Sequence, residues 1–298
     1  MAQEIARFTL SAGDGAAIAA YRSLPAGPAR GVVQIAHGLA EHFARYGRLT
    51  DRLTAAGWAV YGADHRGHGA SAEVHGLGHF GCGGFQSVVD DMATLSAVAR
   101  REVPGVPLVL LGHSMGSFAA QLYILDHGEG LAGLVLSGTA AQVLLVASLA
   151  GRPAGLAALN ADFEPARTPF DWLSRDEAEV DAYIADPLCG FEADPGSMAS
   201  LFTLGAAART DPRLYRLRGK FPILVISGEV DPVVGPGQAF ARALVESYEG
   251  AGLGPVTHRV YPGGRHEMFN ETCREEVEGD LIAWLDGIAP HGHSRQGP

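Results

Sequence analysis

The sequence Leu-Val-Leu-Leu-Gly-His-Ser-Met-Gly, residues 108–116, joins an apolar run to a G-x-S-x-G pattern. Residues 107–111 are typical of a buried strand, and an apolar-periodic stretch at 118–125 predicts a helix. A serine at the tip of a sharp turn between a strand and a helix is the arrangement of a nucleophile elbow. The turn predicts a strained backbone at Ser114, and it presents the hydroxyl at the positive N-terminal end of the helix.

The pentapeptide is a weak signal by itself, because the chain holds 40 glycines among its 298 residues. Gly112 and Gly116 leave room for the strand to pack closely on the helix. A solvated serine in a glycine-softened turn would give the same pattern. The interpretation of Ser114 as a nucleophile therefore depends on finding a base and an acid further along the chain.

Apolar strands alternate with helical stretches along most of the chain, which predicts an α/β fold, a mostly parallel sheet with helices on both faces. Alternating runs at 5–10 and 16–22 predict an antiparallel hairpin before it. Ligands of such sheets bind at the carboxyl ends of the strands, so His37, Asp64 and Ser114 should line one rim. The other predicted strands are 31–36, 58–63, 131–136, 221–227 and 256–261, and the other predicted helices are 45–56, 85–101, 238–248 and 275–288.

The alternation stops between residues 139 and 215, where no strong strand pattern occurs and six prolines interrupt the chain. We interpret this region as a helical cap over the strand ends. The expected organisation is therefore a core of residues 1–138 and 216–290, a cap of residues 139–215 and a disordered tail of residues 291–298. The helix-like segments of the cap are 143–149, 156–159 and 176–184.

Composition and charge argue against several classes of protein. The chain is 47% apolar and 18% charged, which is typical of a globular enzyme. A net charge of −11 without a basic cluster argues against nucleic-acid binding, because phosphate contacts need a basic footprint. Cys82, Cys189 and Cys273 show neither metal-ligand nor disulfide spacing, so we expect no metal and a reducing, cytoplasmic location. The sequence makes no prediction of the oligomeric state.

One uncharged stretch, residues 131–151, has about the length of a membrane span. Glycines and the polar residues Ser137, Thr139 and Gln142 interrupt it. We interpret it as a buried strand followed by an apolar helix, and we expect no stable membrane span. Residues 1–10 lack the apolar segment of a signal peptide.

A serine nucleophile needs a general base, and that base needs an orienting carboxylate. In doubly wound hydrolase sheets the chain order is Ser, acid, His. Asp231, in the loop after a late strand, is the preferred acid, and Glu229 in the same loop is the alternative. His266 is the predicted base because it lies between the last strand and the last helix, whereas His258 lies inside a strand.

The oxyanion of an acyl-transfer reaction needs two backbone N–H groups. One should come from Met115, immediately after the nucleophile. The other should come from the loop that follows the strand at 31–36, which points to Leu39. Leu39 is a positional inference, because the role does not depend on the side chain.

Together these residues resemble the monoacylglycerol lipase/lysophospholipase branch of the serine α/β-hydrolases, over about residues 5–288. The resemblance implies an eight-stranded sheet, a helical cap and hydrolysis of carboxylic esters without a cofactor. It supports Ser114, Asp231 and His266 as the triad. The motifs that carry the resemblance are His37-Gly38-Leu39-Ala40-Glu41-His42 with Arg45-Tyr46, Asp64-His65-Arg66-Gly67-His68-Gly69-Ala70-Ser71, Gly112-His113-Ser114-Met115-Gly116, Gly228 with Asp231, and His266-Glu267.

The same resemblance implies a polar substrate pocket. It maps the family's pocket residues onto Glu41 and Arg45, and the histidine beside the nucleophile onto His113. In monoacylglycerol lipases this corner meets the glycerol hydroxyls. The alternative is that Glu41 and Arg45, four residues apart, form an ion pair that braces the loop.

The predicted function is ester hydrolysis through an acyl-enzyme, on monoacylglycerol-, lysophospholipid- or short-chain-ester-type small molecules. The apolar segment 143–159 is expected to cover the acyl chain. A cofactor-free haloperoxidase, an acyltransferase and a proline-directed peptidase would keep the same triad. A dehalogenase or an epoxide hydrolase would need Asp at position 114, and a non-catalytic ligand-binding protein would lack a triad member.

Overall fold

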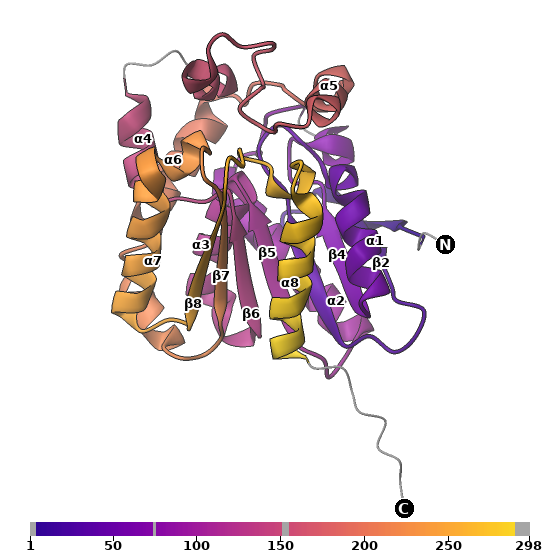
Figure 1. Ribbon diagram of the computed structural model, residues 1–298. Coiled ribbons are helices and arrows are strands. Elements are labelled where there is room, and N and C mark those ends of the chain that lie inside the picture. Colours follow the sequence, from indigo (N-terminus) through magenta and orange to yellow (C-terminus); the bar gives the residue numbers. More distant parts are fainter. Residues whose placement is uncertain (1–3, 74–75, 151–154, 290–298) are drawn as a thin grey trace, which may run out of the picture.

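The computed structural model describes residues 4–73, 76–150 and 155–289. A single eight-stranded sheet lies at its centre, in the order β1-β2-β4-β3-β5-β6-β7-β8 (Figure 1). β1 and β2 are antiparallel to each other and β2 is antiparallel to β4, whereas the strands from β3 to β8 pair in parallel. The predicted mostly parallel sheet is therefore confirmed. The strands are β1 (Ala6–Ser11), β2 (Ala17–Ser23), β3 (Gly31–Ala36), β4 (Trp58–Ala63), β5 (Leu108–His113), β6 (Gly133–Ser137), β7 (Ile223–Gly228) and β8 (Val256–Tyr261).

Long helices cover both faces of the sheet (Figure 1). They are α1 (Gly47–Ala55), α2 (Gly84–Glu102), α3 (Met115–His127), α7 (Ala239–Ala251) and α8 (Arg274–Ile288). On one face, Leu53 of α1 and Leu281 of α8 share an apolar cluster with Val33 of β3. On the other face, α2, α3 and α7 pack in a second cluster that contains Val88 and Leu244. The central strands are buried between these two layers, which explains their continuous apolar sequences.

Between β6 and β7, the described residues form helices and loops but no strand. The helices are α4 (Gln142–Leu149), η4 (Leu156–Phe163), α5 (Glu177–Ala185), α6 (Pro195–Ala208) and η5 (Pro212–Leu217). Figure 1 shows α4, α5 and α6 at one end of the sheet. The helix α6 was missed by the sequence analysis, which interpreted Pro195 as a break. Proline at the first position of a helix leaves every helical hydrogen bond intact, so it marks a start there.

The other predicted elements differ from the observed ones at their ends, the predicted helix at 156–159 is the longer 3₁₀ helix η4, and several 3₁₀ turns were not predicted. The predicted helix at 45–56 begins as a 3₁₀ turn before α1, and the helix of the elbow begins at Met115 rather than at residue 118. The predicted tail at 291–298 lies outside the described residues. The other 3₁₀ turns are η1 (Phe43–Tyr46), η2 (Gly69–Glu73), η3 (Gly128–Gly130), η6 (Pro232–Val234), η7 (Pro236–Gln238) and η8 (Met268–Asn270).

The uncharged stretch at 131–151 contains β6 and α4, as predicted, up to its last described residue, Ala150. β6 lies inside the sheet between β5 and β7. Within the described ranges, no helix has the length and apolar character that a membrane crossing requires.

Candidate active site

The turn between β5 and α3 holds Ser114 in a strained backbone conformation, with φ 51° and ψ −120°. Positive φ is uncommon for a residue with a side chain, and it occurs where the surroundings enforce it. Here the Ser114 N–H donates to the carbonyl of Ser137 at 2.9 Å, and the Ser114 carbonyl accepts the N–H of Ser117 at 2.8 Å. The predicted elbow is therefore present, and β6 and α3 hold it from both sides.

Glycines on either side of the elbow allow the backbone segments to approach. A Cβ at Gly116 would lie 2.1 Å from the carbonyl oxygen of Ala36, and one at Gly112 would lie 2.4 Å from that of Gly116. These neighbours are backbone atoms, which cannot swing aside as a flexible side chain could. Any side chain at either position would push α3 away from the sheet and would move the serine.

A histidine and a carboxylate meet beside this turn. Nδ1 of His266 lies 3.0 Å from each carboxylate oxygen of Asp231, and both side chains are buried. Asp231 follows β7, and its Oδ1 also accepts the N–H of Val233 at 2.8 Å. The alternative acid, Glu229, instead accepts the N–H of Gly263 at 2.8 Å on the surface. The geometry therefore favours Asp231 as the partner of the histidine.

The environment of His266 makes its imidazole a stronger base than usual. Burial alone would lower the pKa of His266, but the charge of Asp231 and the hydrogen bond to it raise this pKa above 6.5. Because Nδ1 carries the proton that is donated to Asp231, the neutral ring has its lone pair on Nε2. That Nε2 is buried and has no hydrogen-bond partner in the described part of the chain. A buried lone pair of this kind is available for a proton.

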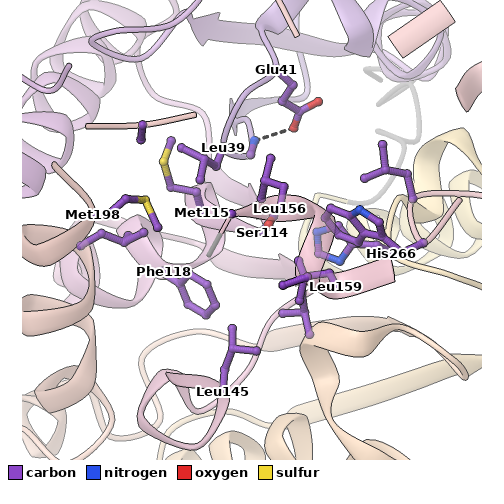
Figure 2. Close-up of a pocket in the computed structure, with 18 of the residues that line it drawn as sticks. Leu39, Glu41, Ser114, Met115, Phe118, Leu145, Leu156, Leu159, Met198 and His266 are labelled. Carbon is purple, nitrogen blue, oxygen red and sulfur yellow. Dashed lines mark hydrogen bonds between the residues drawn. The ribbon is translucent and has the colours of Figure 1, made fainter. Parts of the chain in front are cut away.

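The two predicted oxyanion donors come from two different segments beside the elbow. Leu39 follows β3 in a turn where Ala40 has φ 56°, and Met115 is the first residue of α3. Figure 2 shows Leu39 and Met115 on one side of Ser114 and His266 on the other. In the described part of the chain neither N–H has an acceptor of its own. Both remain free to donate to a ligand.

The polar corner predicted from the resemblance is a buried network of ion pairs. Arg45 Nη1 donates to Glu41 at 2.8 Å. The guanidinium also forms a bidentate ion pair with Glu267, in which Nη1 and Nη2 each donate to one carboxylate oxygen, Nη2 at 2.6 Å. Glu41 additionally accepts the hydroxyl of Tyr46 at 2.8 Å and the N–H of Gly38 at 2.5 Å. The bracing alternative is therefore present in the structure. Glu41 also lines the cavity, whereas Arg45 does not.

Glu267 was missed as a site residue, although it directly follows the predicted base. Burial would raise the pKa of Glu267, but the charge of Arg45 and its hydrogen bonds hold this pKa below 4.5. The carboxylate thus stays charged and ties the loop of His266 to the loop of Leu39. The available signal in the sequence was an acidic residue directly after the predicted base, with no basic residue at helical spacing to pair with it.

His113 lies against the predicted base. Its ring centre is 4.7 Å from that of His266, and its Nδ1 lies 3.3 Å from the hydroxyl oxygen of Ser137. Burial and the nearby charge of His266 lower the pKa of His113 to about 4, so its ring is neutral near pH 7. Trp172 also packs against His266, with the two ring centres 4.8 Å apart. No sequence pattern marks Trp172, which comes from the segment between β6 and β7.

His37 and Asp64 follow the carboxyl ends of β3 and β4, on the same rim of the sheet as Ser114, as expected, but neither lines the cavity. Both side chains are buried and hydrogen-bonded to loop backbone, and Asp64 also accepts the hydroxyl of Tyr21 at 2.9 Å. Nε2 of His37 accepts the N–H of His65 at 2.9 Å, and Asp64 accepts the N–H groups of Phe43 and Ala70 at 2.9 and 2.8 Å. They hold the loops after β3 and β4 in place behind the site.

A cavity of about 520 Å³ lies over the elbow, with Ser114 and His266 in its wall (Figure 2). This volume falls in the range of sites that bind small molecules. Most of the wall is apolar and comes from α3 and from the helices between β6 and β7. The charged residues of the lining are Glu41 and Glu267, which both bind Arg45, and Glu192. The apolar lining includes Leu39, Met115, Phe118, Leu145, Leu149, Leu156, Leu159, Trp172, Leu173, Met198, Leu201, Phe202 and Val233.

The eight-stranded sheet, the strained serine turn and the buried acid–histidine pair define an α/β-hydrolase. A family model described as serine aminopeptidase, S33, matches residues 27–273. A monoacylglycerol lipase of Mycolicibacterium smegmatis is 35% identical over 272 residues, which span 86% of this chain and 88% of the relative. A monoglyceride lipase of Mus musculus is 29% identical, over 90% of this chain and 84% of the relative.

Among solved structures, a thermostable carboxyl esterase from Bacillus coagulans, in complex with glycerol, superposes with a TM-score of 0.84 at 29% identity. The match covers 96% of this chain and 99% of the esterase. The chain therefore belongs to the S33 family of α/β-hydrolases, in its monoacylglycerol lipase-like branch. It is a carboxylic ester hydrolase.

Proposed function

We propose that Ser114 is the nucleophile of an acyl-enzyme mechanism and that the substrates are monoacylglycerols. The observation that carries the proposal is the free Nε2 of His266, which shares a cavity with the strained Ser114 while Nδ1 is bound to Asp231. A base oriented by a carboxylate, in the same cavity as a serine hydroxyl, is what activates the serine at neutral pH.

The reaction proceeds in two halves. Nε2 of His266 takes the hydroxyl proton as the oxygen of Ser114 attacks the ester carbonyl, and the N–H groups of Leu39 and Met115 bind the oxyanion. The imidazolium, stabilised by Asp231, then gives its proton to the departing alcohol, which leaves an acyl-serine. In the second half, Nε2 of His266 takes a proton from a water molecule as that water attacks the carbonyl of the acyl-serine. The imidazolium then returns the proton to the oxygen of Ser114, and the carboxylic acid leaves. Ser114 and a neutral His266 are restored.

The distribution of polarity in the cavity supports a substrate with one long apolar arm and one hydroxylated end. Leucine, methionine and phenylalanine side chains line most of the wall, which suits an acyl chain. Glu41 and His113 line the polar end, and we propose that they contact the glycerol hydroxyls. A carboxylate has about four acceptor positions, so Glu41 can bind a hydroxyl in addition to its partners. Arg45 would act through Glu41.

We propose that residues 139–215 form a cap over the acyl chain, with the core formed by residues 1–138 and 216–290. The contribution of α4, η4 and α6 to the cavity wall supports this division. A cytoplasmic location is also a proposal, and the free state of Cys82, Cys189 and Cys273 supports it.

Labelling and a substrate panel test the proposed function. A fluorophosphonate probe should modify Ser114, identified by peptide mass analysis. Monoacylglycerols with short, medium and long acyl chains should then be compared with a lysophospholipid, p-nitrophenyl esters and N-terminal proline amides. We expect the highest kcat/KM for a monoacylglycerol and no amide cleavage. Labelling of another residue would refute the nucleophile, and faster amide hydrolysis would favour a peptidase.

The pH profile should report the raised pKa of the base. Because His266 must be neutral to accept the proton, kcat/KM should rise with pH through an apparent pKa above 6.5. His113, with a pKa of about 4, is already neutral in this range, so its titration does not contribute to the pH profile. The measurement is kcat/KM for a soluble ester across the acid limb. The variant His258→Gln, in β8 and outside the cavity, is the control and should keep the midpoint. A wild-type midpoint below 6.5 would contradict the assignment.

A further inference from the structure

Three side chains with metal-binding atoms meet where the loop after β3 contacts the segment after α5. They are His42, Asp186 and Cys189, and their ligand atoms all lie within 4.8 Å of one another. Nε2 of His42 is 2.8 Å from Oδ2 of Asp186, although the two residues are 144 positions apart in the chain. None of the three lines the cavity over Ser114 or takes part in the proposed reaction.

The turn that carries two of these groups is held in shape by its own backbone. Oδ1 of Asp186 accepts the N–H of Leu188 at 2.8 Å, which leaves Oδ2 directed at His42. The N–H of Cys189 donates to the carbonyl of Asp186 at 3.0 Å. This turn brings the carboxylate and the thiol to the same side, so little rearrangement is needed for both to reach one ion.

The turn is also fixed against the loop that carries the histidine. The N–H of Gly190 donates to the carbonyl of Ala40 at 3.0 Å, and Ala40 is two residues before His42. The side chain of His42 is 12% exposed and that of Asp186 is 31% exposed. The cluster is therefore preformed by both segments and still open to an ion and to water.

We propose that His42, Asp186 and Cys189 form a binding site for a zinc-type divalent cation, separate from the catalytic centre. One imidazole nitrogen, one carboxylate oxygen and one thiolate sulfur are the ligand types that Zn²⁺ prefers, and water would complete a tetrahedron. Binding replaces the hydrogen bond between Nε2 of His42 and Asp186 with two metal–ligand bonds, and the proton of the neutral imidazole then lies on Nδ1. It also releases the thiol proton of Cys189 to solvent as the Zn–S bond forms.

The position of the site gives the ion a structural role. Residues 186–190 belong to the segment between β6 and β7, whereas His42 lies three residues after Leu39. An ion bound to both would cross-link these two segments next to the predicted oxyanion loop. The sequence analysis found no metal spacing because the third ligand lies far from the other two along the chain. Only the fold brings it near.

Cobalt and zinc titrations of the full chain test the site. Co²⁺ should bind with one equivalent and give the thiolate-to-cobalt charge-transfer absorption, which histidines and carboxylates alone do not produce. The variant Cys189→Ser should lose this absorption and should weaken Zn²⁺ affinity by at least about tenfold. Cys273→Ser, at a partly buried cysteine outside the cluster, is the matched control and should keep both.

Two further readouts keep the test decisive. Zn²⁺ should raise the Tm of the wild type and leave the Tm of Asp186→Asn unchanged, while metal-free melting curves show that each variant folds. No cobalt–thiolate absorption in the wild type, or an unchanged one in Cys189→Ser, would overturn the proposal. So would loss of the absorption in Cys82→Ser, because Cys82 shares a separate surface hollow with His79 and Asp194.

Discussion

Replacing Ser114 with alanine should reduce ester hydrolysis by roughly 10⁶-fold in kcat, as expected when the nucleophile of a serine hydrolase is removed. The only other hydroxyl in the described part of the cavity wall belongs to Tyr183, a phenol whose pKa is raised by burial and whose ring packs against the guanidinium of Arg45. The residual rate would come from oxyanion binding by Leu39 and Met115. The measurement is single-turnover and steady-state hydrolysis of a monoacylglycerol.

The same substitution should leave the fold intact. Alanine at φ 51° carries about the same backbone strain as serine, so the Tm of Ser114→Ala should stay near that of the wild type. Ser247→Ala is the matched control, because Ser247 lies in α7 outside the cavity and its hydroxyl donates to the carbonyl of Ala243 at 2.8 Å. It should cost about 1 kcal/mol of stability and keep most of the activity. Comparable hydrolysis by Ser114→Ala and the wild type would refute the mechanism.

The strands and the serine turn could be predicted because their sequence signals are local. A fully buried parallel strand such as β5 needs a continuous apolar run, and the elbow needs small residues where Ala36 approaches Gly116. The chain order of acid and base then follows from the topology, which placed Asp231 and His266 together. These features depend on residues that are neighbours in the sequence and on the known chain order of Ser, acid and His in this fold.

The features that escaped prediction depend on contacts between distant segments. Glu267 acquires its role only when the loop after β8 meets Arg45, and Trp172 only when its segment covers His266. His37 and Asp64 satisfied the rule for strand ends, yet their side chains turned into the loop backbone instead of the cavity. A residue's position along the chain indicates the edge of the sheet at which it lies. It does not indicate the direction of its side chain.

Replacing Asp231 with asparagine should lower kcat/KM by about 10⁴-fold while the site keeps its shape. The amide oxygen can still accept the N–H of Val233, which Oδ1 of Asp231 accepts at 2.8 Å. The amide nitrogen would then face Nδ1 of His266, and as a donor it favours the tautomer with the proton on Nε2. That tautomer cannot accept the proton of Ser114. The measurement is kcat/KM at the optimum of the wild type.

The pH dependence separates this loss from a general loss of structure. Without the charge of Asp231, burial would lower the pKa of His266, so the acid limb of Asp231→Asn should move to lower pH than that of the wild type. Glu229→Gln removes a carboxylate from the same loop, where Glu229 accepts the N–H of Gly263 on the surface. It should keep both the rate and the pH profile. A large loss of kcat/KM in Glu229→Gln, together with a small loss in Asp231→Asn, would show that Glu229 is the acid of the triad. The reason is that only the carboxylate that orients His266 controls its tautomer.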